Sequence, residues 1–557
     1  MKRLPLRRAP GRRRRVAAFL ALTLATLLAL SGCNIAVQGG SSGAGEPGAV
    51  LIAADTGSPT MARNFNPFAS SARVGAKFMY EPLGVMNQID GKDTMFLATG
   101  YRVENPTTIV FTIRRGVTWT DGADFTPADV AFTFGLLKAH VALDTTGVWQ
   151  HVKSVAVSGD DVTFHLLGPD VPAAQIIENV PIVPQHIWSG VADPVTFTNQ
   201  TPVVTGPYTL GTFNPNEYTL VKNDHYWQAD KVAIDKLVFP GSNSQLDIVD
   251  NGYDWAYSFL TDVQNTWVKQ NGGKNVYWYP PGGTIALFPN LTKAPFNNLN
   301  FRQALSYSLN RKQIADTAEQ GYVQPAGQSG LLLPNQQKWL DPSLPNGGNI
   351  SQDTAKALSY YQKAGYHQSG GKMVDASGRQ LVLTITTANG YSDWLQGVQT
   401  VQKQLSALGI SVKINQPQPA AYAQQQQNGT YDLIVGSYGG TGSVYQDFNN
   451  LLNSKFAAPI GTATTANYQR FKSPAADKLL AQYQATSDPA TQLRIAHQLE
   501  QIVYTQLPAI GMFYGGLWGL FSNANFTGWP SQADPYAPPI TWMSSVLLIL
   551  THLKKAS

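Results

Sequence analysis

The sequence predicts an α/β fold of the mixed α+β type, built as more than one lobe. Strands of alternating apolar and polar residues, such as 108–113 and 162–167, stand among long helical segments, such as 393–408. At 557 residues, the chain also exceeds what one hydrophobic core usually supports. We therefore expect two or three lobes that combine helices with strands.

Local signals set the limits of several elements. The apolar run 49–53 predicts the first strand of the folded body. Thr126 followed by Pro127 predicts an N-cap and the first residue of a helix. The helix at 393–408 is expected to end where Gly409 follows it.

Two apolar segments are too short to be comfortable membrane spans. Val16–Leu30 has fifteen residues and Val546–Leu550 has five, whereas a spanning helix needs about 20. We interpret the first as the core of a secretory signal, because a run of Lys and Arg residues precedes it. The second predicts a buried strand.

Cys33 is the only cysteine in the chain. The stretch Leu30-Ser31-Gly32-Cys33 resembles a bacterial lipobox, in which a diacylglycerol is attached to the thiol and the preceding peptide bond is cut. The resemblance implies a signal peptide at 1–32 and lipidation of Cys33. The segment 33–48, rich in Gly, Ser and Ala, would then be a flexible tether. A lone cysteine also excludes intrachain disulfides and cysteine-based metal sites.

The basic character of the chain belongs to its first segment. Of 40 Lys and Arg residues, eight precede Val16, so the chain from Cys33 onward carries 32 of them against 35 Asp and Glu, a net charge of −3. A net charge of −3 does not indicate a basic surface for binding nucleic acid. Apolar residues make up 43% and charged residues 13%, which excludes a mostly disordered chain.

Five blocks of sequence stand out when they are taken together. They are Asn64-Phe65-Asn66-Pro67-Phe68, Phe111 to Gly122, Phe125 to Val130, Gly206-Pro207-Tyr208 with Lys222 to Trp227, and Asn300 to Leu305. These blocks resemble the family 5 extracellular solute-binding proteins, the oligopeptide-, dipeptide- and nickel-binding components of bacterial ABC importers. Their order and spacing follow the family from about residue 50 to 520.

The resemblance implies a periplasmic-binding-protein type II-like two-lobe fold with an extra family 5 subdomain. It implies that the protein captures an extracellular oligopeptide or oligosaccharide by hinge closure and delivers it to the permease subunits of an ABC importer. The protein would be a monomer anchored to the outer face of the cell membrane, with no cofactor and no nucleic-acid partner. The implied parts are lobe I at 49–80, 190–300 and 510–557, the extra subdomain at 80–190, and lobe II at 300–510.

The alternatives are a secreted surface hydrolase and a nickel- or metal-chelate-binding protein. No His-Glu-x-x-His motif and no Walker phosphate-binding loop occurs, and the eight histidines are scattered. Asp121, Asp124 and Asp129 cluster at a turn and a helix start, where carboxylates accept hydrogen bonds from free backbone amides. We therefore expect no catalytic residues and no metal ligands.

In oligopeptide-binding members of this family, an aspartate after a tryptophan pairs with the α-ammonium of the ligand. In the matching stretch of this chain, Tyr438 takes the place of the tryptophan and Thr441 that of the aspartate. A neutral hydroxyl cannot supply the charge-assisted pairing that a buried ammonium requires. The resemblance thus implies weak amine anchoring, with Asp447 as the nearby carboxylate that could substitute.

Aromatic residues complete the set of predicted ligand contacts, because flat apolar faces with a polar edge suit sugar rings. The tail at Gly528-Trp529-Pro530-Ser531 and Asp534-Pro535-Tyr536-Ala537 also resembles family members that bind β-linked oligosaccharides. Peptide and oligosaccharide both stay open as ligands. The predicted contacts are Tyr438, Thr441, Asp447, Trp255, Tyr257, Tyr391, Trp394 and Trp518.

Overall fold

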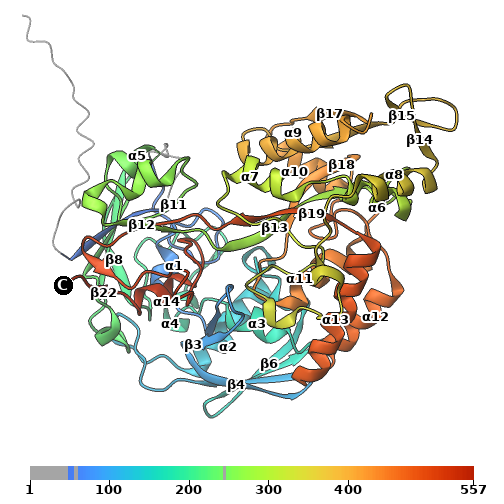
Figure 1. The fold of residues 1–557 in the computed structure, drawn as a ribbon. Coiled ribbons are helices and arrows are strands. Elements are labelled where there is room, and N and C mark those ends of the chain that lie inside the picture. Colours follow the sequence, from blue (N-terminus) through green and yellow to red (C-terminus); the bar gives the residue numbers. More distant parts are fainter. Residues whose placement is uncertain (1–47, 55–59, 243–245) are drawn as a thin grey trace, which may run out of the picture. The chain divides into compact units, whose positions relative to one another are not determined.

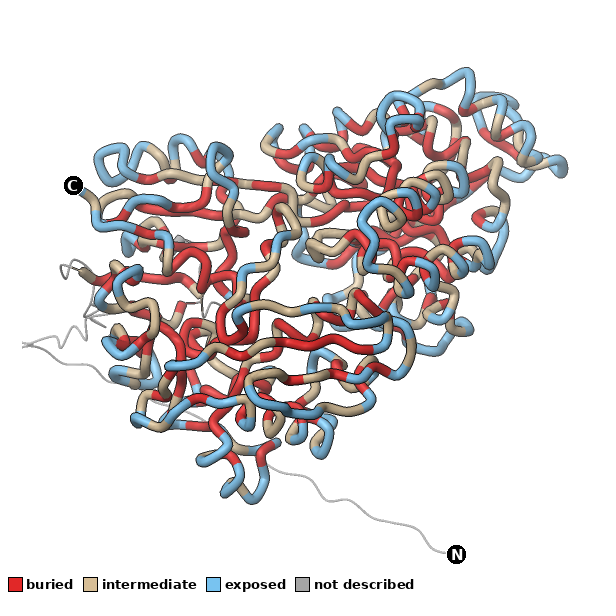
Figure 2. The backbone as a smooth tube through the Cα atoms, turned by 90° about the horizontal axis from the view of Figure 1, so that it is seen from below, coloured by how far each residue is buried: buried red, intermediate tan, exposed pale blue. Residues whose placement is uncertain are grey.

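The computed structural model describes residues 48–54, 60–242 and 246–557. The predicted signal peptide, Cys33 and all but the last residue of the predicted tether lie outside these ranges. Among the described residues, no helix is long and apolar enough to cross a membrane. Figure 2 shows that buried segments run through the interior of the folded body, whereas exposed segments lie at its periphery.

One sheet of the described chain has seven strands, in the order β12-β20-β11-β1-β10-β9-β8 (Figure 1). Their bounds are β1 Ala49–Ala53, β8 Tyr208–Asn214, β9 Glu217–Lys222, β10 Lys236–Pro240, β11 Trp255–Tyr257, β12 Asn275–Trp278 and β20 Gly519–Ser522. The central strand β1 is parallel to both of its neighbours. Every residue of β1 is buried, as expected for a continuous apolar run inside a sheet.

A second sheet has five described strands, in the order β17-β16-β18-β13-β19. Their bounds are β13 Pro281–Pro289, β16 Val382–Thr386, β17 Ser411–Asn415, β18 Leu433–Tyr438 and β19 Ile510–Gly516. Helices α6 to α9 pack with one another and on this sheet, and α11 to α13 form a second helical group. The helices and the hairpin of this region are α6 Leu299–Tyr307, α7 Arg311–Glu319, α8 Thr354–Lys363, β14 Tyr366–Ser369, β15 Lys372–Asp375, α9 Ser392–Ser406, α10 Pro419–Asn428, α11 Val444–Leu452, α12 Pro474–Gln484 and α13 Pro489–Gln506.

A third sheet of the described residues has four strands, in the order β4-β5-β7-β6. Helix α2 covers it, and Phe134 of that helix packs against Phe164 of β7 with ring centroids 4.7 Å apart. The elements of this region are β2 Gly84–Met86, β3 Asp93–Met95, β4 Ala98–Asn105, β5 Thr108–Ile113, α2 Pro127–Ala139, β6 Val152–Ser158, β7 Asp161–Leu166, α3 Ala173–Glu178 and α4 Gln185–Trp188. The remaining helices and strands are α1 Ala76–Met79, α5 Leu246–Asp250, β21 Phe526–Thr527, α14 Val546–Leu550 and β22 Lys554–Lys555.

Two chain segments connect the seven-stranded sheet to the five-stranded sheet. Strand β12 of the first sheet leads directly into β13 of the second, and β19 returns directly into β20 (Figure 1). The two connections lie side by side, since the amide of Leu517 donates to the carbonyl of Pro280 at 2.7 Å. Paired short connections of this kind are the arrangement that a hinge between two lobes needs.

Several predicted elements are confirmed. Strands β1 and β5 match the predicted runs, and α2 begins at Pro127. The amide of Thr126 donates to the carboxylate of Asp129 at 2.9 Å, so this acidic side chain caps the helix as expected. Helix α9 ends at Ser406, and Gly409 adopts a φ of +81° just beyond it.

The prediction of a strand at Val546–Leu550 is wrong, because this segment is helix α14. All five residues are buried, and the helix packs against α1. A short run that is apolar at every position has no periodicity, so its pattern cannot distinguish a buried strand from a buried helix. The surrounding packing decides between them.

Two pairs of carboxyl groups among the described residues each join a buried glutamate to a half-buried aspartate. Glu178 lies beside Asp93, and Glu319 lies beside Asp393. Burial, together with the neighbouring carboxylate, raises the pKa of Glu178 to about 10 and that of Glu319 to about 9. Each glutamate therefore keeps its proton at neutral pH and donates it to its aspartate.

These pairs predict that the protein becomes less stable as the pH rises from 5 to 8. In the unfolded chain a glutamate loses its proton near its ordinary pKa of 4.5, whereas Glu178 and Glu319 hold theirs in the folded chain up to about pH 9. The unfolded state thus binds fewer protons throughout this window, and each pH unit lowers the free energy of unfolding by up to about 1.4 kcal/mol per group. Urea denaturation should show a loss of at least about 2 kcal/mol between pH 5 and 8.

Matched variants separate these pairs from general charge effects. Glu178→Gln and Glu319→Gln should each flatten the pH dependence, since an amide cannot release a proton. Glu104→Gln, at an exposed position of β4, should leave it unchanged. An unfolding midpoint that is the same at both pH values in the wild type would contradict the prediction.

Candidate ligand-binding cleft

Three adjoining cavities lie where the seven-, five- and four-stranded regions meet. The central cavity has a volume of about 330 Å³ and is lined by Val85, Met86, Gln88, Gln175, Asn179, Gly439, Gly440, Thr441, Met543, Ser544 and Ser545. A side cavity of about 280 Å³ shares Asn179, Met543 and Ser544 with it. A small cavity of about 200 Å³ shares Asn179 and Thr441 with the central one. Because Asn179 lines all three cavities, they adjoin one another at this residue, and the group of three is here called the cleft.

A run of glycines at the end of β18 brings Thr441 to this cleft. Gly439 and Gly440 have φ values of +77° and +81°, in the left-handed region that favours glycine. A Cβ atom on Gly440 would lie 1.9 Å from the carbonyl oxygen of Gly282 in β13. The loop that presents Thr441 therefore packs backbone to backbone on the strand that crosses between the sheets.

The structure places Thr441 beside Asp447, as expected if Asp447 replaces the family's aspartate as the partner of a ligand ammonium. The carboxylate of Asp447, however, already accepts hydrogen bonds from within the protein. Its Oδ1 accepts hydrogen bonds from the hydroxyl of Thr441 at 2.7 Å and from the amide of Thr441 at 3.1 Å. Its Oδ2 accepts a hydrogen bond from Gln336 at 2.7 Å. Asp447 is only 2% exposed, and burial raises its pKa. A ligand ammonium would have to displace these donors.

Two of the predicted aromatic contacts are packed in the core. Trp255 is fully buried, with its ring centroid 5.8 Å from that of Phe78 and 5.6 Å from that of Trp529. Trp255 therefore offers no face to a ligand in this structure, and we drop it from the ligand contacts. Tyr438 is also buried and packs edge-on to Phe288 at 6.2 Å.

The other predicted aromatic residues occupy different surroundings. Tyr257 is half-buried and meets Trp542 edge-on at 4.4 Å. Tyr391 is exposed and packs on Trp394 at 5.0 Å, but neither of them lines the cavities of the cleft. Trp518 is half-buried within an aromatic cluster that also contains Phe259, Tyr277, Tyr279 and Tyr322.

Sequence analysis missed a cavity of about 420 Å³ beside the crossing strands, here called the hinge cavity. Its aromatic lining consists of Trp278, Tyr279, Tyr322 and Tyr514, which come from three separate segments of the chain. Pro280, Pro281 and Asn335 lie beside them. No local pattern brings these rings together, so only their composition could have indicated this cavity. The missed Trp542 lines the side cavity and stands just after the tail that resembles oligosaccharide binders.

The hairpin turn between β2 and β3 lies between the central cavity and the hinge cavity. Gln88 lines the first, whereas Ile89 and Asp90 line the second. The ammonium of Lys338 donates to the carbonyl of Asp90 at 3.0 Å. The side-chain amide of Asn87 donates to the carbonyl of Pro535 at 3.4 Å. The hairpin thus contacts both of the other sheet regions at the cleft.

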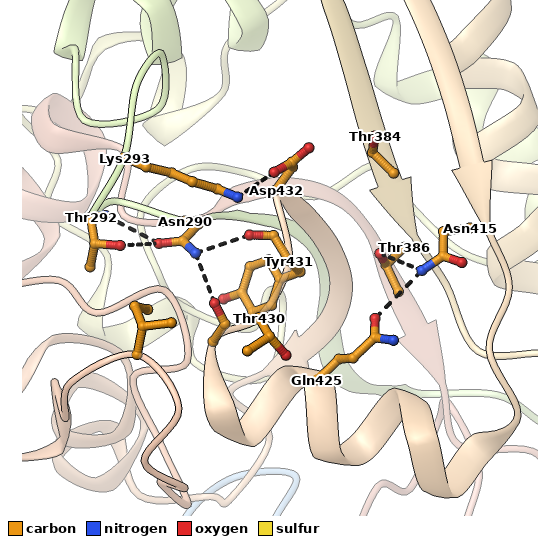
Figure 3. Close-up of a pocket in the computed structure, with 12 residues that line it drawn as sticks. Asn290, Thr292, Lys293, Thr384, Thr386, Asn415, Gln425, Thr430, Tyr431 and Asp432 are labelled. Atoms are coloured by element: carbon orange, nitrogen blue, oxygen red, sulfur yellow. Dashed lines mark hydrogen bonds and ion pairs between the residues drawn. The ribbon is translucent and has the colours of Figure 1, made fainter.

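Figure 3 shows a further cavity, of about 370 Å³, which is lined from the region of the five-stranded sheet alone. Much of its polar lining is satisfied internally. The side-chain amide of Asn290 donates to the carbonyls of Gly429 and Tyr431 at 2.8 and 2.9 Å, and Lys293 pairs with Asp432. Because the four-stranded and seven-stranded regions do not contribute, this cavity does not respond to a movement between sheets.

Potential metal ligands do not gather in the part of the chain that the structure describes. No group of three or more His, Cys, Asp and Glu side chains could hold a metal ion there. Two of the three aspartates near α2, Asp121 and Asp129, accept hydrogen bonds from backbone amides as predicted. Asp121 accepts hydrogen bonds from the amide of Ala123 at 3.2 Å and pairs with His186 at 2.7 Å.

Comparison with known proteins agrees with this architecture. Residues 94–459 match the family described as bacterial extracellular solute-binding proteins, family 5 middle. The chain belongs to this family. The glutathione-binding protein GsiB of Salmonella choleraesuis is 25% identical over 482 residues, which cover 82% of this chain and 87% of that protein. GsiB of Escherichia coli K12 is 24% identical over 483 residues, with the same shares of both chains.

Solved structures of the family have the same fold. The periplasmic oligopeptide-binding protein of Thermotoga maritima superposes with a TM-score of 0.82 at 24% identity, over 91% of this chain and 99% of that one. Its mannohexaose-bound form gives 0.74, again at 24% identity, over 92% and 99%. NikZ of Campylobacter jejuni in complex with Ni(L-His) gives 0.69 at 17% identity, over 92% and 100%. The predicted family and the type II-like fold class are confirmed.

The glycine loop before Thr441 gives a stability prediction with a built-in control. Gly439→Ala should cost about 1–2 kcal/mol, because it adds only the strain of a left-handed backbone, and its Cβ would be 3.9 Å from the nearest atom outside the loop. Gly440→Ala adds a clash with the backbone of β13 and should cost at least about 3 kcal/mol. Urea denaturation of both variants measures the difference, and equal losses would contradict the packing described for this loop.

Proposed function

We propose that this protein is the substrate-binding lipoprotein of an ABC importer, and that it captures an extracellular oligopeptide or oligosaccharide in the cleft and delivers it to the permease. The cleft of adjoining cavities, lined from all three sheet regions, is the observation that carries the proposal. A ligand held there contacts both sides of the crossing strands, so its binding energy favours closure of the hinge.

The proposed lobes follow the boundaries implied by the sequence, with lobe I and lobe II on either side of the crossing strands. The relatives give the range of ligands to consider. GsiB is named for glutathione, and the Thermotoga protein was solved with mannohexaose. Thr441 supports a ligand that does not depend on its α-ammonium, because its hydroxyl already donates to Asp447. The aromatic hinge cavity supports an oligosaccharide equally well.

We propose further that the protein releases its ligand unchanged and carries out no reaction. It acts as a monomer, held at the outer face of the membrane by a lipid on Cys33. The relatives are binding subunits of importers, which supports this assignment. The segment 33–48, rich in Gly and Ser, supplies a tether between lipid and body.

A thermal-shift screen of the purified protein against peptides and oligosaccharides tests the proposed function. A true ligand at 100 times its dissociation constant should stabilise the fold by about 2.7 kcal/mol. For a peptide ligand, N-acetylation should change the affinity by less than about threefold, whereas loss of a buried ion pair typically changes it by about 30- to 5,000-fold.

Two results would oppose this assignment. A hundredfold loss of affinity on N-acetylation would show a conventional amine anchor, with Asp447 as the first carboxylate to substitute. Recovery of chemically altered ligand after long incubation, measured by mass spectrometry, would show an enzyme. A peptide methylated on its α-amine, which keeps the positive charge, serves as the control for the effect of chemical modification itself.

If Cys33 carries the lipid, the substitution Cys33→Ala should release the protein from the membrane or leave an unprocessed precursor. The thiol is the atom to which the lipid would be attached, and the chain has no other cysteine. Membrane fractionation and intact-mass measurement of wild type and variant give the answer. Ser31→Ala, two residues earlier, is the matched control and should remain anchored. A Cys33→Ala protein that is still anchored and correctly trimmed would reject the lipobox.

A further inference from the structure

A lysine without a partner faces the side cavity. Lys77 belongs to α1, whose neighbouring residues Phe78 and Met79 are buried in the core. Its side chain lines the side cavity together with Trp542 and Asn179. In the described part of the chain, the ammonium of Lys77 makes no hydrogen bond and no ion pair, and burial lowers its pKa.

Two other buried cations of the protein, Arg302 and Arg311, donate hydrogen bonds to oxygen atoms of the protein itself. Arg302 donates to the carbonyls of Phe296 and Gln506 at 2.8 to 3.1 Å. Arg311 donates to the carbonyls of Gly511 and Ile350 and to the hydroxyl of Ser306, each within 2.8 Å. A desolvated cation is costly unless it is paired. Lys77 differs from these two arginines, because its side chain borders the side cavity and does not donate to any described group of the protein.

The carboxylates nearest the cleft are already occupied. Asp144, beside residues that line the side cavity, accepts hydrogen bonds from the amides of Val148 and Trp149 at 2.9 and 3.0 Å. Asp447 is held by Thr441 and Gln336, as described above. Glu178, which immediately precedes Asn179, keeps its proton and carries no charge at neutral pH. No described carboxylate lies within ion-pair distance of Lys77.

Asn179 connects Lys77 to the rest of the cleft. It lines the central, side and small cavities, and its side-chain amide makes no hydrogen bond within the described residues. It can therefore donate to a ligand oxygen at the junction, in addition to the donors of Lys77. A ligand that extends from Thr441 through the central cavity reaches Asn179, which also lines the side cavity together with Lys77.

We propose that Lys77 binds a carboxylate of the transported ligand, so that the protein selects an acidic oligopeptide or oligosaccharide over its uncharged counterpart. The inference rests on the proposed function and specifies the chemistry of the ligand. The geometry that supports it is an unpaired ammonium on the wall of the side cavity, which shares Asn179, Met543 and Ser544 with the central cavity. The carboxylate is common to a peptide C-terminus and a uronic acid, and the two arms of the experiment distinguish these sources.

The experiment compares matched ligand pairs by titration calorimetry. One pair is mannohexaose and a hexamer of mannuronic acid, and the other is a tetrapeptide and its C-terminal amide. In the arm that contains the true ligand type, the carboxylate-bearing member should bind the wild type at least about 30-fold more tightly. Lys77→Met should reduce this preference to less than about threefold, and Lys77→Arg should retain at least about tenfold.

Control measurements keep the test interpretable. Lys312→Met removes a lysine that pairs with Asp316 on the surface of α7, far along the chain from the cleft, and should leave the preference unchanged. The melting temperature of Lys77→Met should equal or exceed that of the wild type, since the variant removes an unpaired desolvated charge. A variant that melts lower but keeps binding the neutral member of the pair is still folded, so its lost preference counts in favour of the proposal.

Three results would overturn the proposal. If the wild type binds the neutral member as tightly as the acidic one, or if Lys77→Met keeps the preference, the ammonium does not select the ligand, and the proposed function stands without it. If no member of either pair binds, while the broader thermal-shift screen finds no ligand, the proposed function fails as well.

Discussion

The pair of crossing strands is the constraint on which the rest of this structure depends. The chain passes from the seven-stranded sheet to the five-stranded sheet through β12 and β13 and returns through β19 and β20. Leu517 and Pro280 hold the two passages together by a backbone hydrogen bond. Because both passages are short, rotation about them is the simplest relative movement of the two sheets. The glycine loop that presents Thr441 packs against the same strand, so the cleft is attached to the hinge itself.

The electrostatics of the cleft follow from which charges are neutralised inside the protein. Asp447 is held by hydrogen bonds from Thr441 and Gln336, and Glu178 keeps its proton beside Asp93. Lys77 is left without a partner among the described residues. Among the described residues that line the cleft, Lys77 is therefore an unpaired cation, whereas Thr441 presents a neutral hydroxyl that already donates to Asp447.

Aromatic residues divide into two groups according to their exposure. Trp255 and Tyr438 stabilise the core, since their rings pack against other aromatic rings and are buried. Tyr279 and Tyr322 are only partly buried and face the hinge cavity. The hinge cavity lies next to the crossing strands. A ring on its wall would therefore contact a ligand at the place where the two sheets would move relative to each other.

The sequence by itself determined the family, the mixed α/β class, strand β1, the capped start of α2 and the neutral residue at position 441. These features depend on signals that act within a few residues, such as a cap, a glycine or an ordered block. The tertiary structure decided the rest. It placed Trp255 in the core, made Val546–Leu550 a helix, and brought Lys77 and Asn179 to the wall of the same cavity. Segments hundreds of residues apart meet there, and only their packing fixes which side chains are buried and which face the cavity.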